Sequence, residues 1–375
     1  MATIKQVLRN SFFIVFALII TTVGNAQFKH PGHLSNLNEL KFIRKKIKNG
    51  QEPWLTAFNK MKLSAEAKKD YLPAPAKLIH IGTNNINPRI GYDEIDRDSK
   101  ASYVQALMWF ITEDKQYAKN VINICKSWGE TLQEINPERN GPLVVAWYAT
   151  LFCRGAEIVK YTCKEWNTEV ETPFIKMLDE EFYPLIKSGS ANHNPLNPDW
   201  ANSPVWDRHA GNWSTSKIES LLAMAIFKND KAEFDRVIAL ARERIEQYIT
   251  PYGKMQEICR DIGHMQFTLG GLINIAEMAR HQGIDLYAYL DNRMMKGMEY
   301  SAAIINGETP SPSPGCTTLN DIKFHPAGWE IGYNHYHNRM GLSLPQTIKL
   351  LAKNRPDGMS RHWGWGSLTH QQLDE

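Results

Sequence analysis

The sequence has few cysteines, and the five that are present follow no metal-binding or redox pattern. Their number is odd, and no pair shows the Cys-x-x-Cys spacing of zinc sites and thiol–disulfide sites. We therefore expect buried thiols, with one disulfide as the alternative in an oxidising compartment. The five are Cys125, Cys153, Cys163, Cys259 and Cys316.

Signatures of bound metals and nucleotides are missing as well. The chain has no His-Glu-x-x-His motif, no calcium loop rich in Asp and Asn, no phosphate-binding loop and no dinucleotide fingerprint. It also lacks the Gly-x-Ser-x-Gly nucleophile elbow, which argues against Ser-His-Asp catalysis. We therefore predict no catalytic metal and no cofactor.

The chain has little net charge. Its 43 basic and 40 acidic residues give a formal charge of +3, and the basic residues form no run. Proteins that bind nucleic acid through a basic surface are therefore excluded. A polyanion other than nucleic acid would have to be held by a local basic cleft.

We expect no apolar run of membrane length after the N-terminal segment. Lys5 and Arg9 precede an apolar run over residues 12–20, and small and polar residues follow up to Ala26. This order is typical of a secretory signal peptide cleaved after Ala26, with an uncleaved anchor as the alternative. Because Gln27 follows instead of cysteine, no lipid attachment is expected. Residues 1–26 thus predict a secreted or periplasmic protein without a membrane span.

Helical periodicity dominates the rest of the chain, which we predict to be a single domain over residues 27–375. The stretch 231–249 is the clearest case, with one apolar stripe and one charged face. Similar patterns recur in pairs, which predicts stacked αα-hairpins in an all-α solenoid or closed toroid. The other helical stretches are 36–48, 54–69, 98–112, 115–130, 143–162, 169–187, 213–227, 264–281, 284–302 and 344–353.

Three long breaks interrupt these helices, over residues 71–97, 188–211 and 303–342. Long loops inside a helical domain are usually functional or disordered, and the last two are rich in Trp, Tyr and His, which disfavours disorder. Polar clusters lie in or beside the last two breaks and in the shorter gap between the stretches 231–249 and 264–281, and they predict a site that holds a carboxylate and moves a proton. The clusters are Gly211-Asn212-Trp213, Glu257-x-x-Arg260-x-x-x-His264 and Asn334-His335-Tyr336-His337-Asn338-Arg339.

Taken in order along the chain, several segments resemble the alginate-lyase superfamily of polysaccharide lyases. The likeness covers residues 90–370. The segments are Asp98-Ser-Lys-Ala-Ser-Tyr103, Trp109-Phe-Ile-Thr-Glu-Asp-Lys-Gln-Tyr117, Gly211-Asn212-Trp213, Glu257-Ile-Cys-Arg260-Asp-Ile-Gly-His264, Tyr333-Asn-His-Tyr336 and Gly364-Trp365-Gly366-Ser-Leu-Thr-His370.

The resemblance implies a fold and a reaction. The fold would be an incomplete (α/α) toroid of about five to seven hairpins around a central cleft. The reaction would be β-elimination on a uronate polymer, most simply alginate. The chain departs from better-known alginate lyases, which carry Asn-His where Asn212 is followed here by Trp213. They also have a segment rich in Arg and Tyr, where this chain has Arg260 and His264. A divergent polyuronate lyase is therefore expected.

The chemistry of β-elimination assigns roles to these residues. Removing the C5 proton builds negative charge on the neighbouring carboxylate, which Asn212 and Arg260 would neutralise. His264 is our candidate for the C5 base, and Tyr336 for the acid at O4, with Arg260 or Arg339 lowering the tyrosine pKa. Glu257 would orient this group. The predicted substrate-binding residues are Glu257, Arg339, His335, Trp206, Trp213, His209 and Tyr333.

Each assignment has a structural alternative. Asn212 could cap a helix, and Glu257 could form an ion pair with Arg260. His264 and Tyr336 could be core residues whose polar atoms are satisfied. Four other polar residues are predicted to have structural and not catalytic roles: Arg154, Glu157, His362 and His370.

Three other functions remain open from the sequence. A glucuronan lyase would use the same residues on a different polymer. A glycoside hydrolase on a helical toroid would need two carboxylates, with Glu257 as one and Asp207, Asp261 or Glu330 as the other. A non-catalytic glycan-binding protein of the cell envelope would cleave nothing.

Overall fold

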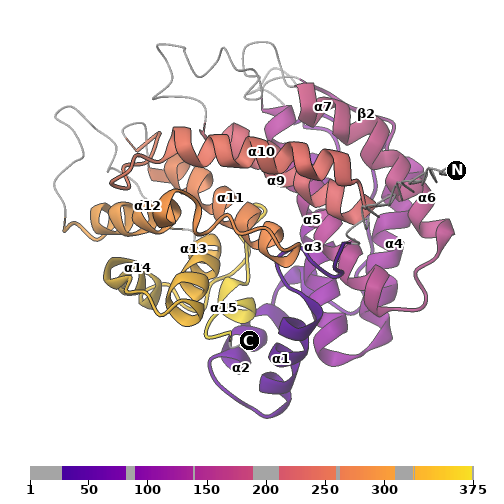
Figure 1. Cartoon of the computed structure of the whole chain (residues 1–375). Helices are drawn as coiled ribbons and strands as arrows, with labels where there is room; N and C mark the ends of the chain where they lie inside the picture. Colours follow the sequence, from indigo (N-terminus) through magenta and orange to yellow (C-terminus); the bar gives the residue numbers. More distant parts are fainter. Residues whose placement is uncertain are drawn as a thin grey trace, which may run out of the picture.

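Long helices with short connections dominate the computed structural model (Figure 1). It describes residues 28–81, 89–137, 140–188, 211–258, 262–308, 324 and 326–373. The predicted signal peptide, residues 1–26, lies outside these ranges.

Five helix pairs follow one another in the described part of the chain, each with one inner and one outer member. The helices within the first four pairs are joined by short connections, and η5 lies between the two members of the last pair, so the helices of a pair run antiparallel. The pairs are α3 (Tyr92–Thr112) with α4 (Lys115–Thr131), α5 (Gly141–Thr162) with α6 (Thr168–Met177), α9 (Gly211–Lys228) with α10 (Lys231–Tyr248), α11 (Ile262–His281) with α12 (Tyr289–Ile305), and α13 (Pro326–Tyr333) with α14 (Pro345–Ala352).

Smaller elements complete the ring. Helix α1 packs on α3, and α15 packs on α13 and α2, so the first and last described helices lie beside each other (Figure 1). A two-residue parallel ladder joins β1 to β2. These elements are α1 (Leu37–Lys48), α2 (Trp54–Lys62), the 3-10 helix η1 (Ala65–Ala67), β1 (Leu78–Ile79), β2 (Glu134–Ile135) and α15 (Gly366–Thr369); the π-helices are η2 (Leu178–Phe182), which leads into α7 (Tyr183–Ser188), and η5 (Asn334–Arg339) after α13.

The inner helices run parallel to one another. Between α5 and α9, Trp147 Nε1 donates to Ser216 Oγ at 2.9 Å, and Arg154 pairs with Glu219 further along both helices. Between α9 and α11, Asn274 Nδ2 donates to Glu219 Oε1 at 2.8 Å, again advancing along both. The contacts thus keep the same direction on every helix.

The same direction holds at both ends of the ring. Between α3 and α5, the ring centres of Tyr92 and Tyr148 lie 6.3 Å apart, and further along both helices Ser102 Oγ donates to the Leu151 carbonyl at 3.1 Å. Between α11 and α13, a Cβ on Gly328 would lie 3.0 Å from the Gly270 Cα, so the two backbones touch. The N-terminal ends of α3, α5, α9, α11 and α13 therefore meet at one rim, which we call the N-terminal rim.

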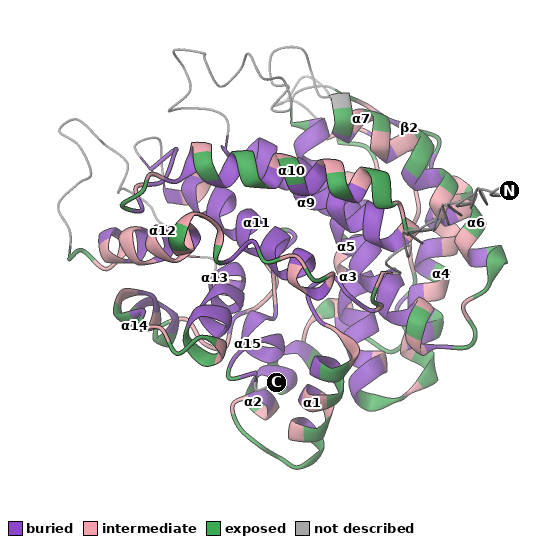
Figure 2. Ribbon diagram, in the orientation of Figure 1, coloured by how far each residue is buried: buried purple, intermediate pink, exposed green. Residues whose placement is uncertain are grey.

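Burial separates the inner from the outer helices (Figure 2). Every residue of α9 from Gly211 to Phe227 is buried, whereas α10 buries one stripe and exposes its charged face. Helix α5 is apolar and long enough to cross a membrane, yet its most apolar stretch lies entirely inside the protein. It is a core helix, and one continuous apolar cluster extends from Leu34 to Leu373.

Local sequence explains where several helices begin. Asn36 and Glu39 form a capping box at the start of α1, and the Asp230 carboxylate accepts the N–H of Glu233 at the start of α10. Such caps satisfy backbone donors that the first helical turn leaves without partners.

The helical periods of the sequence are confirmed with shifts of a few residues, except around α13. Residues 326–339 were expected to belong to the break 303–342, but they form α13 and η5. Pro326, Gly328 and Gly332 lower helix propensity there. The segment is also buried on nearly every side, so it shows no amphipathic stripe. The segment is therefore helical because of its packing against the rest of the protein, and not because of its helix propensity.

The cysteines that the structure describes are free and buried, as predicted for thiols without a metal. They are Cys125, Cys153 and Cys163. Burial raises the pKa of the Cys125 and Cys153 thiols, so neither is a reactive thiolate. Cys259 and Cys316 lie outside the described residues.

Lys217 of α9 is a buried amine whose Nζ has no hydrogen-bond partner among the described residues. Burial lowers its pKa to about 8. Because an unpaired buried cation destabilises the fold, Lys217→Met should raise stability by about 1–3 kcal/mol, read as a higher melting temperature. The exposed Lys231→Met is the control and should change little. A fall in melting temperature for Lys217→Met would show that the amine has a partner.

Candidate active site

Helix starts gather at the N-terminal rim, and this gives the rim its electrostatic character. Unpaired N–H groups and the helix macrodipole make a helix N-terminus attractive to anions. Here five such ends face one region, although the whole chain has little net charge. A polyanion is therefore favoured at this rim.

Asn212 lies in the first turn of α9, at the rim. Gly211 before it packs against α11 so closely that a Cβ would lie 2.4 Å from Thr268 Oγ1. The Asn212 side chain is 3% exposed, and its Oδ1 has no partner among the residues that the structure describes. The helix begins at Gly211, and Asn212 is therefore not its N-cap. The amide is thus held at the rim without a structural partner for its oxygen.

Glu257 holds this helix start in place. Its Oε2 accepts the backbone N–H of Asn212 at 3.0 Å and the hydroxyl of Thr268 at 2.8 Å, so one carboxylate ties α9 to α11. Glu257 has φ of 65°, a left-handed conformation that is costly for a residue with a side chain. Strain of this kind is typical of functional sites. Glu257 thus fixes the start of α9 against α11, and its predicted orienting role stays a prediction.

His264 lies two residues into α11 and is partly exposed. Its carbonyl oxygen is 3.3 Å from Thr268 Oγ1, so the hydroxyl bonded to Glu257 also contacts the His264 turn. The structure therefore brings Asn212, Glu257 and His264 together at adjacent helix starts, as the sequence predicted. Trp213, which was predicted to bind substrate, is buried.

A stack of aromatic rings, missed from the sequence, connects α5, α11 and the C-terminal segment. Trp147 stacks on Phe267 at 5.5 Å and on His362 at 5.4 Å, and Phe267 stacks on Trp363 at 4.5 Å. Trp147 and Phe267 belong to helical stretches whose aromatic residues read as core, so spacing gave no signal of a surface platform.

Arg361 covers this stack. Its guanidinium carbon lies 5.1 Å from the ring centres of both Trp147 and Phe267. The residue is exposed, has φ of 53°, and forms no ion pair with any described residue. It is thus a cation available to an anionic ligand above apolar rings.

A buried ion network supports the stack from below. Glu219 accepts from Arg154 and from Asn274 Nδ2, and its Oε2 lies 3.1 Å from His362 Nε2. Burial would raise the pKa of Glu219, but His362 and Arg154 hold it below its ordinary range. Burial in turn lowers the pKa of His362. Arg154 and His362 thus have the structural roles expected from the sequence.

The cluster at residues 334–339 does not join the site. Tyr336 is fully buried, and its hydroxyl donates to the carbonyl oxygen of Tyr287 at 2.9 Å. Burial raises the pKa of Tyr336, which opposes proton transfer by its oxygen. The prediction that Tyr336 supplies the acid is therefore not supported, and its alternative as a satisfied core tyrosine describes the structure.

Its neighbours are also engaged elsewhere. His335 stacks on Tyr287 at 3.7 Å, and burial lowers its pKa to about 4. Arg339 pairs with Glu277 and Glu39. Because Arg339 meets Glu277, thirteen residues beyond His264 on α11, it lies about 20 Å along the helix from the rim. The substrate-binding predictions for His335 and Arg339 are therefore not supported.

Tyr333 is buried at the end of α13, where it stacks on His337 at 4.8 Å. Its predicted contact with substrate is not supported either. Parallel inner helices place the start and the end of α13 at opposite rims, and a sequence does not show which end faces the site. Three predicted residues, Arg260, Trp206 and His209, lie outside the described residues, and their roles stay predictions.

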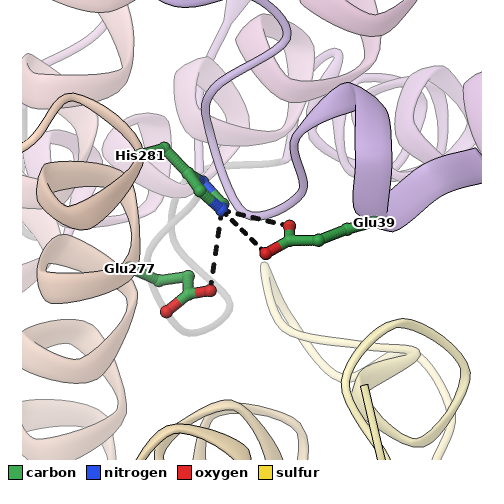
Figure 3. A group of neighbouring side chains, drawn as sticks. All are labelled: Glu39, Glu277 and His281. Atoms are coloured by element: carbon green, nitrogen blue, oxygen red, sulfur yellow. Dashed lines mark hydrogen bonds and ion pairs between the residues drawn. The ribbon is translucent and has the colours of Figure 1, made fainter. Parts of the chain in front are cut away.

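One group of possible metal ligands lies at the far rim (Figure 3). Ligand atoms of Glu39, Glu277 and His281 lie within 4.8 Å of one another. Arg280 Nη2 is 2.6 Å from Glu39 Oε1 and 2.9 Å from Glu277 Oε1, and Arg339 contacts the same two oxygens. The carboxylates are therefore neutralised by guanidinium groups, which disfavours a divalent cation.

Comparison with known proteins gives the family and the fold. The alginate lyase family matches residues 48–310. Alginate lyase A1-III from Sphingomonas species A1 superposes with a TM-score of 0.65 at 16% identity, covering 92% of this chain and 98% of that one. A variant of alginate lyase A1-III complexed with tetrasaccharide gives 0.66 at 17% identity, covering 88% and 94%.

An alginate lyase from Bacteroides ovatus gives a TM-score of 0.57 at 12% identity and covers 91% of this chain and 99% of that one. A search of curated proteins found no match. The structural likeness confirms the predicted incomplete (α/α) toroid, while the family match covers more than half of the chain. The protein therefore belongs to the alginate lyase family and is a polysaccharide lyase.

Proposed function

We propose that the protein cleaves alginate by β-elimination at the N-terminal rim and leaves a 4,5-unsaturated uronate on one new chain end. The observation that carries the proposal is Asn212, a buried amide with an unpartnered oxygen, fixed by Glu257 beside His264. The family match supports the substrate class. The helix ends at the rim favour a chain of carboxylates.

Asn212 stabilises the negative charge that develops on the substrate. When the C5 proton leaves, negative charge develops on the carboxylate carbon and its oxygens. The Asn212 amide donates to this charge, at the end of α9 where the helix dipole adds to the stabilisation. Arg260 is the second donor in the proposal.

Proton transfer falls to His264. Its ring removes the C5 proton, the C5 electrons form the C4–C5 double bond, and the C4–O4 bond breaks. The same ring then returns the proton to O4 where C5–H and O4 share one face of the sugar. A single acid–base group suffices for this geometry, so Tyr336 is not needed.

Arg361 and the rings beneath it form the proposed binding platform. Sugar faces stack on apolar rings, and the guanidinium pairs with a uronate carboxylate. Arg361→Gln should raise KM at least about tenfold and change kcat little, since a charge-assisted hydrogen bond contributes about 1.5–3 kcal/mol. Arg361→Lys should recover part of the affinity. An unchanged KM in Arg361→Gln would show that Arg361 does not bind the substrate.

The substrate is tested with a panel of polymers. Protein lacking residues 1–26 is incubated with alginate, mannuronan, guluronan and glucuronan, and the absorbance of the unsaturated product is followed. We expect alginate or one of its two block polymers to be cleaved fastest. If only glucuronan is cleaved, the substrate is glucuronan and not alginate, and the proposed site stays the same.

Glycoside hydrolysis is less well supported. A hydrolase needs two free carboxyl groups across the cleft. Glu257 is bonded to Asn212 and Thr268, and Glu330 to the guanidinium of Arg355. Asp207 and Asp261 lie outside the described residues. A non-catalytic glycan-binding protein would give no product at all in the panel.

We also propose export. The N-terminal pattern, cleaved after Ala26, directs the single domain 27–375 to the periplasm or the medium, without lipid attachment. Sequencing the N-terminus of protein recovered from outside the cytoplasm should give Gln27. An intact Met1 on membrane-bound protein would instead support the anchor.

A further inference from the structure

A tight turn in the C-terminal segment carries Arg361, the cation of the proposed binding platform. The Ser360 N–H donates to the Trp363 carbonyl at 2.6 Å, and the Trp363 N–H donates to the Ser360 carbonyl at 3.0 Å, so Arg361 and His362 are the two residues of the turn. Arg361 has φ of 53°, which is costly for a residue with a side chain. Such a conformation persists only where the surroundings of the turn fix it.

His362 is the buried residue of this turn, and it is held at three points. Its ring Nε2 lies 3.1 Å from Glu219 Oε2 on α9, and its carbonyl oxygen accepts from Arg154 Nη1 on α5 at 2.8 Å. Its ring also stacks on Trp147 of α5, with 5.4 Å between the ring centres and 11° between the planes. One residue thus attaches the turn to two inner helices.

Glu219 can hold His362 because its own carboxylate is fixed. Its Oε1 accepts from Arg154 and, at 2.8 Å, from Asn274 Nδ2 of α11. Arg154 therefore bonds both to Glu219 and to the His362 carbonyl, which closes a buried ring of three residues. Burial lowers the pKa of His362, so a neutral ring that donates from Nε2 is favoured. The charges of Arg154 and Glu219 cancel, and the network adds no net charge beneath Arg361.

One polar atom of His362 indicates more than a packing role. The residue is 1% exposed, and its Nδ1 has no hydrogen-bond partner within the described ranges. A buried nitrogen without a partner costs stability, so a phenylalanine would be the better ring if packing on Trp147 were the whole role. What the histidine adds is the Nε2 bond to Glu219, which a phenylalanine cannot make.

We propose that His362 is a positioning residue, which together with Glu219 holds the turn so that Arg361 lies over the rings of the platform. In this arrangement the guanidinium carbon is 5.1 Å from two ring centres. His362 does not touch the sugar; it acts through Arg361, whose direction the turn determines. The inference rests on the proposed function, in which Arg361 binds a uronate carboxylate.

Two variants of His362 separate the ring from its hydrogen bond. His362→Phe keeps a ring against Trp147 and removes the donor to Glu219, whereas His362→Gln keeps a donor near the position of Nε2. On the polymer cleaved fastest in the panel, His362→Phe should raise KM about three- to tenfold at nearly unchanged kcat. His362→Gln should stay near the wild type. Glu219 itself is not substituted, because buried Arg154 would lose its partner and the fold would be destabilised.

A double variant shows whether the effect passes through Arg361. In the Arg361→Gln background, His362→Phe should leave KM unchanged, because the guanidinium that it positions is gone. For the same reason, the rise in His362→Phe alone should not exceed the rise in Arg361→Gln.

His33→Phe is the matched control. His33 is another buried histidine beside a buried carboxylate of α5, with its Nδ1 3.3 Å from Glu157 Oε2. Glu157 follows Gly141, the first residue of α5, by sixteen residues, which places it about 24 Å along the helix from the rim. The control should lower the melting temperature and leave KM unchanged.

Hydrogen exchange reports on the turn without any substrate. Amide exchange in the peptide 358–366, measured by mass spectrometry, follows the two bonds between Ser360 and Trp363. Exchange should be faster than in the wild type for His362→Phe, and like the wild type for His362→Gln and for His33→Phe.

The outcomes separate this proposal from the proposed function. Faster exchange in His362→Phe, together with a KM rise that disappears in the Arg361→Gln background, supports the positioning role. Wild-type exchange, an unchanged KM, or a KM rise that persists in the Arg361→Gln background overturns it. If none of the polymers is cleaved, the proposed function fails, and the exchange measurement alone decides whether His362 holds the turn.

Discussion

Asn212→Ala is expected to lower kcat by about 10²–10³ while leaving the melting temperature near that of the wild type. The amide donates to charge that exists only while the C5 proton is leaving, so its loss acts on the rate. The fold should tolerate the change, because Asn212 is not the cap of α9 and its Oδ1 has no partner among the described residues. The measurement is kcat and melting temperature on one protein sample.

The matched control is Asn120→Ala, which removes another buried asparagine amide. Its Nδ2 donates to Gln105 Oε1 at 2.9 Å in a structural network far from α9. This variant should lose stability, by about 1–3 kcal/mol, and keep its rate. A normal kcat in Asn212→Ala would show that Asn212 does not stabilise the charge that develops on the substrate carboxylate.

His264→Asn is expected to lower kcat at least about 100-fold on the polymer whose C5 proton faces the ring, and less on its C5 epimer. The ring is the proposed base, and asparagine keeps polarity without accepting a proton. Rates on mannuronan and on guluronan provide the measurement.

His337→Asn is the control for this variant. His337 is exposed in η5, after the end of α13, and its Nδ1 contacts the carbonyl oxygen of Leu342 at 2.9 Å. Its rate should match the wild type. If His264→Asn turns over both epimers normally, proton transfer belongs to another group, and Tyr92 at the start of α3, with the Arg89 guanidinium 4.5 Å from its ring centre, is the next to test.

The part of the site at helix starts could be predicted from the sequence. The apolar helical patterns of α9 and α11 begin next to three polar residues, Asn212, Glu257 and His264. The positions of such helix starts can be predicted from the sequence alone. The paired periods likewise predicted the hairpins. Because inner helices of a toroid run parallel, residues at successive starts converge, and the resemblance to alginate lyases supplied this arrangement.

The part that depends on packing could not be predicted. Tyr336 and Arg339 have the chemistry of an active site, but only the parallel contact of α13 with α11 shows that they lie at the far rim. The Arg361 platform joins three segments distant in sequence. The sequence pattern places Trp147 and Phe267 among core residues, and most of the surface of both side chains is indeed buried.

The central claim is that each bond is broken by elimination. In one time course on alginate, new reducing ends and ultraviolet absorbance are counted together, before and after addition of EDTA. We expect one unsaturated end for every new reducing end, at a rate that EDTA leaves unchanged. Reducing ends that accumulate without the absorbance would show hydrolysis and contradict the account.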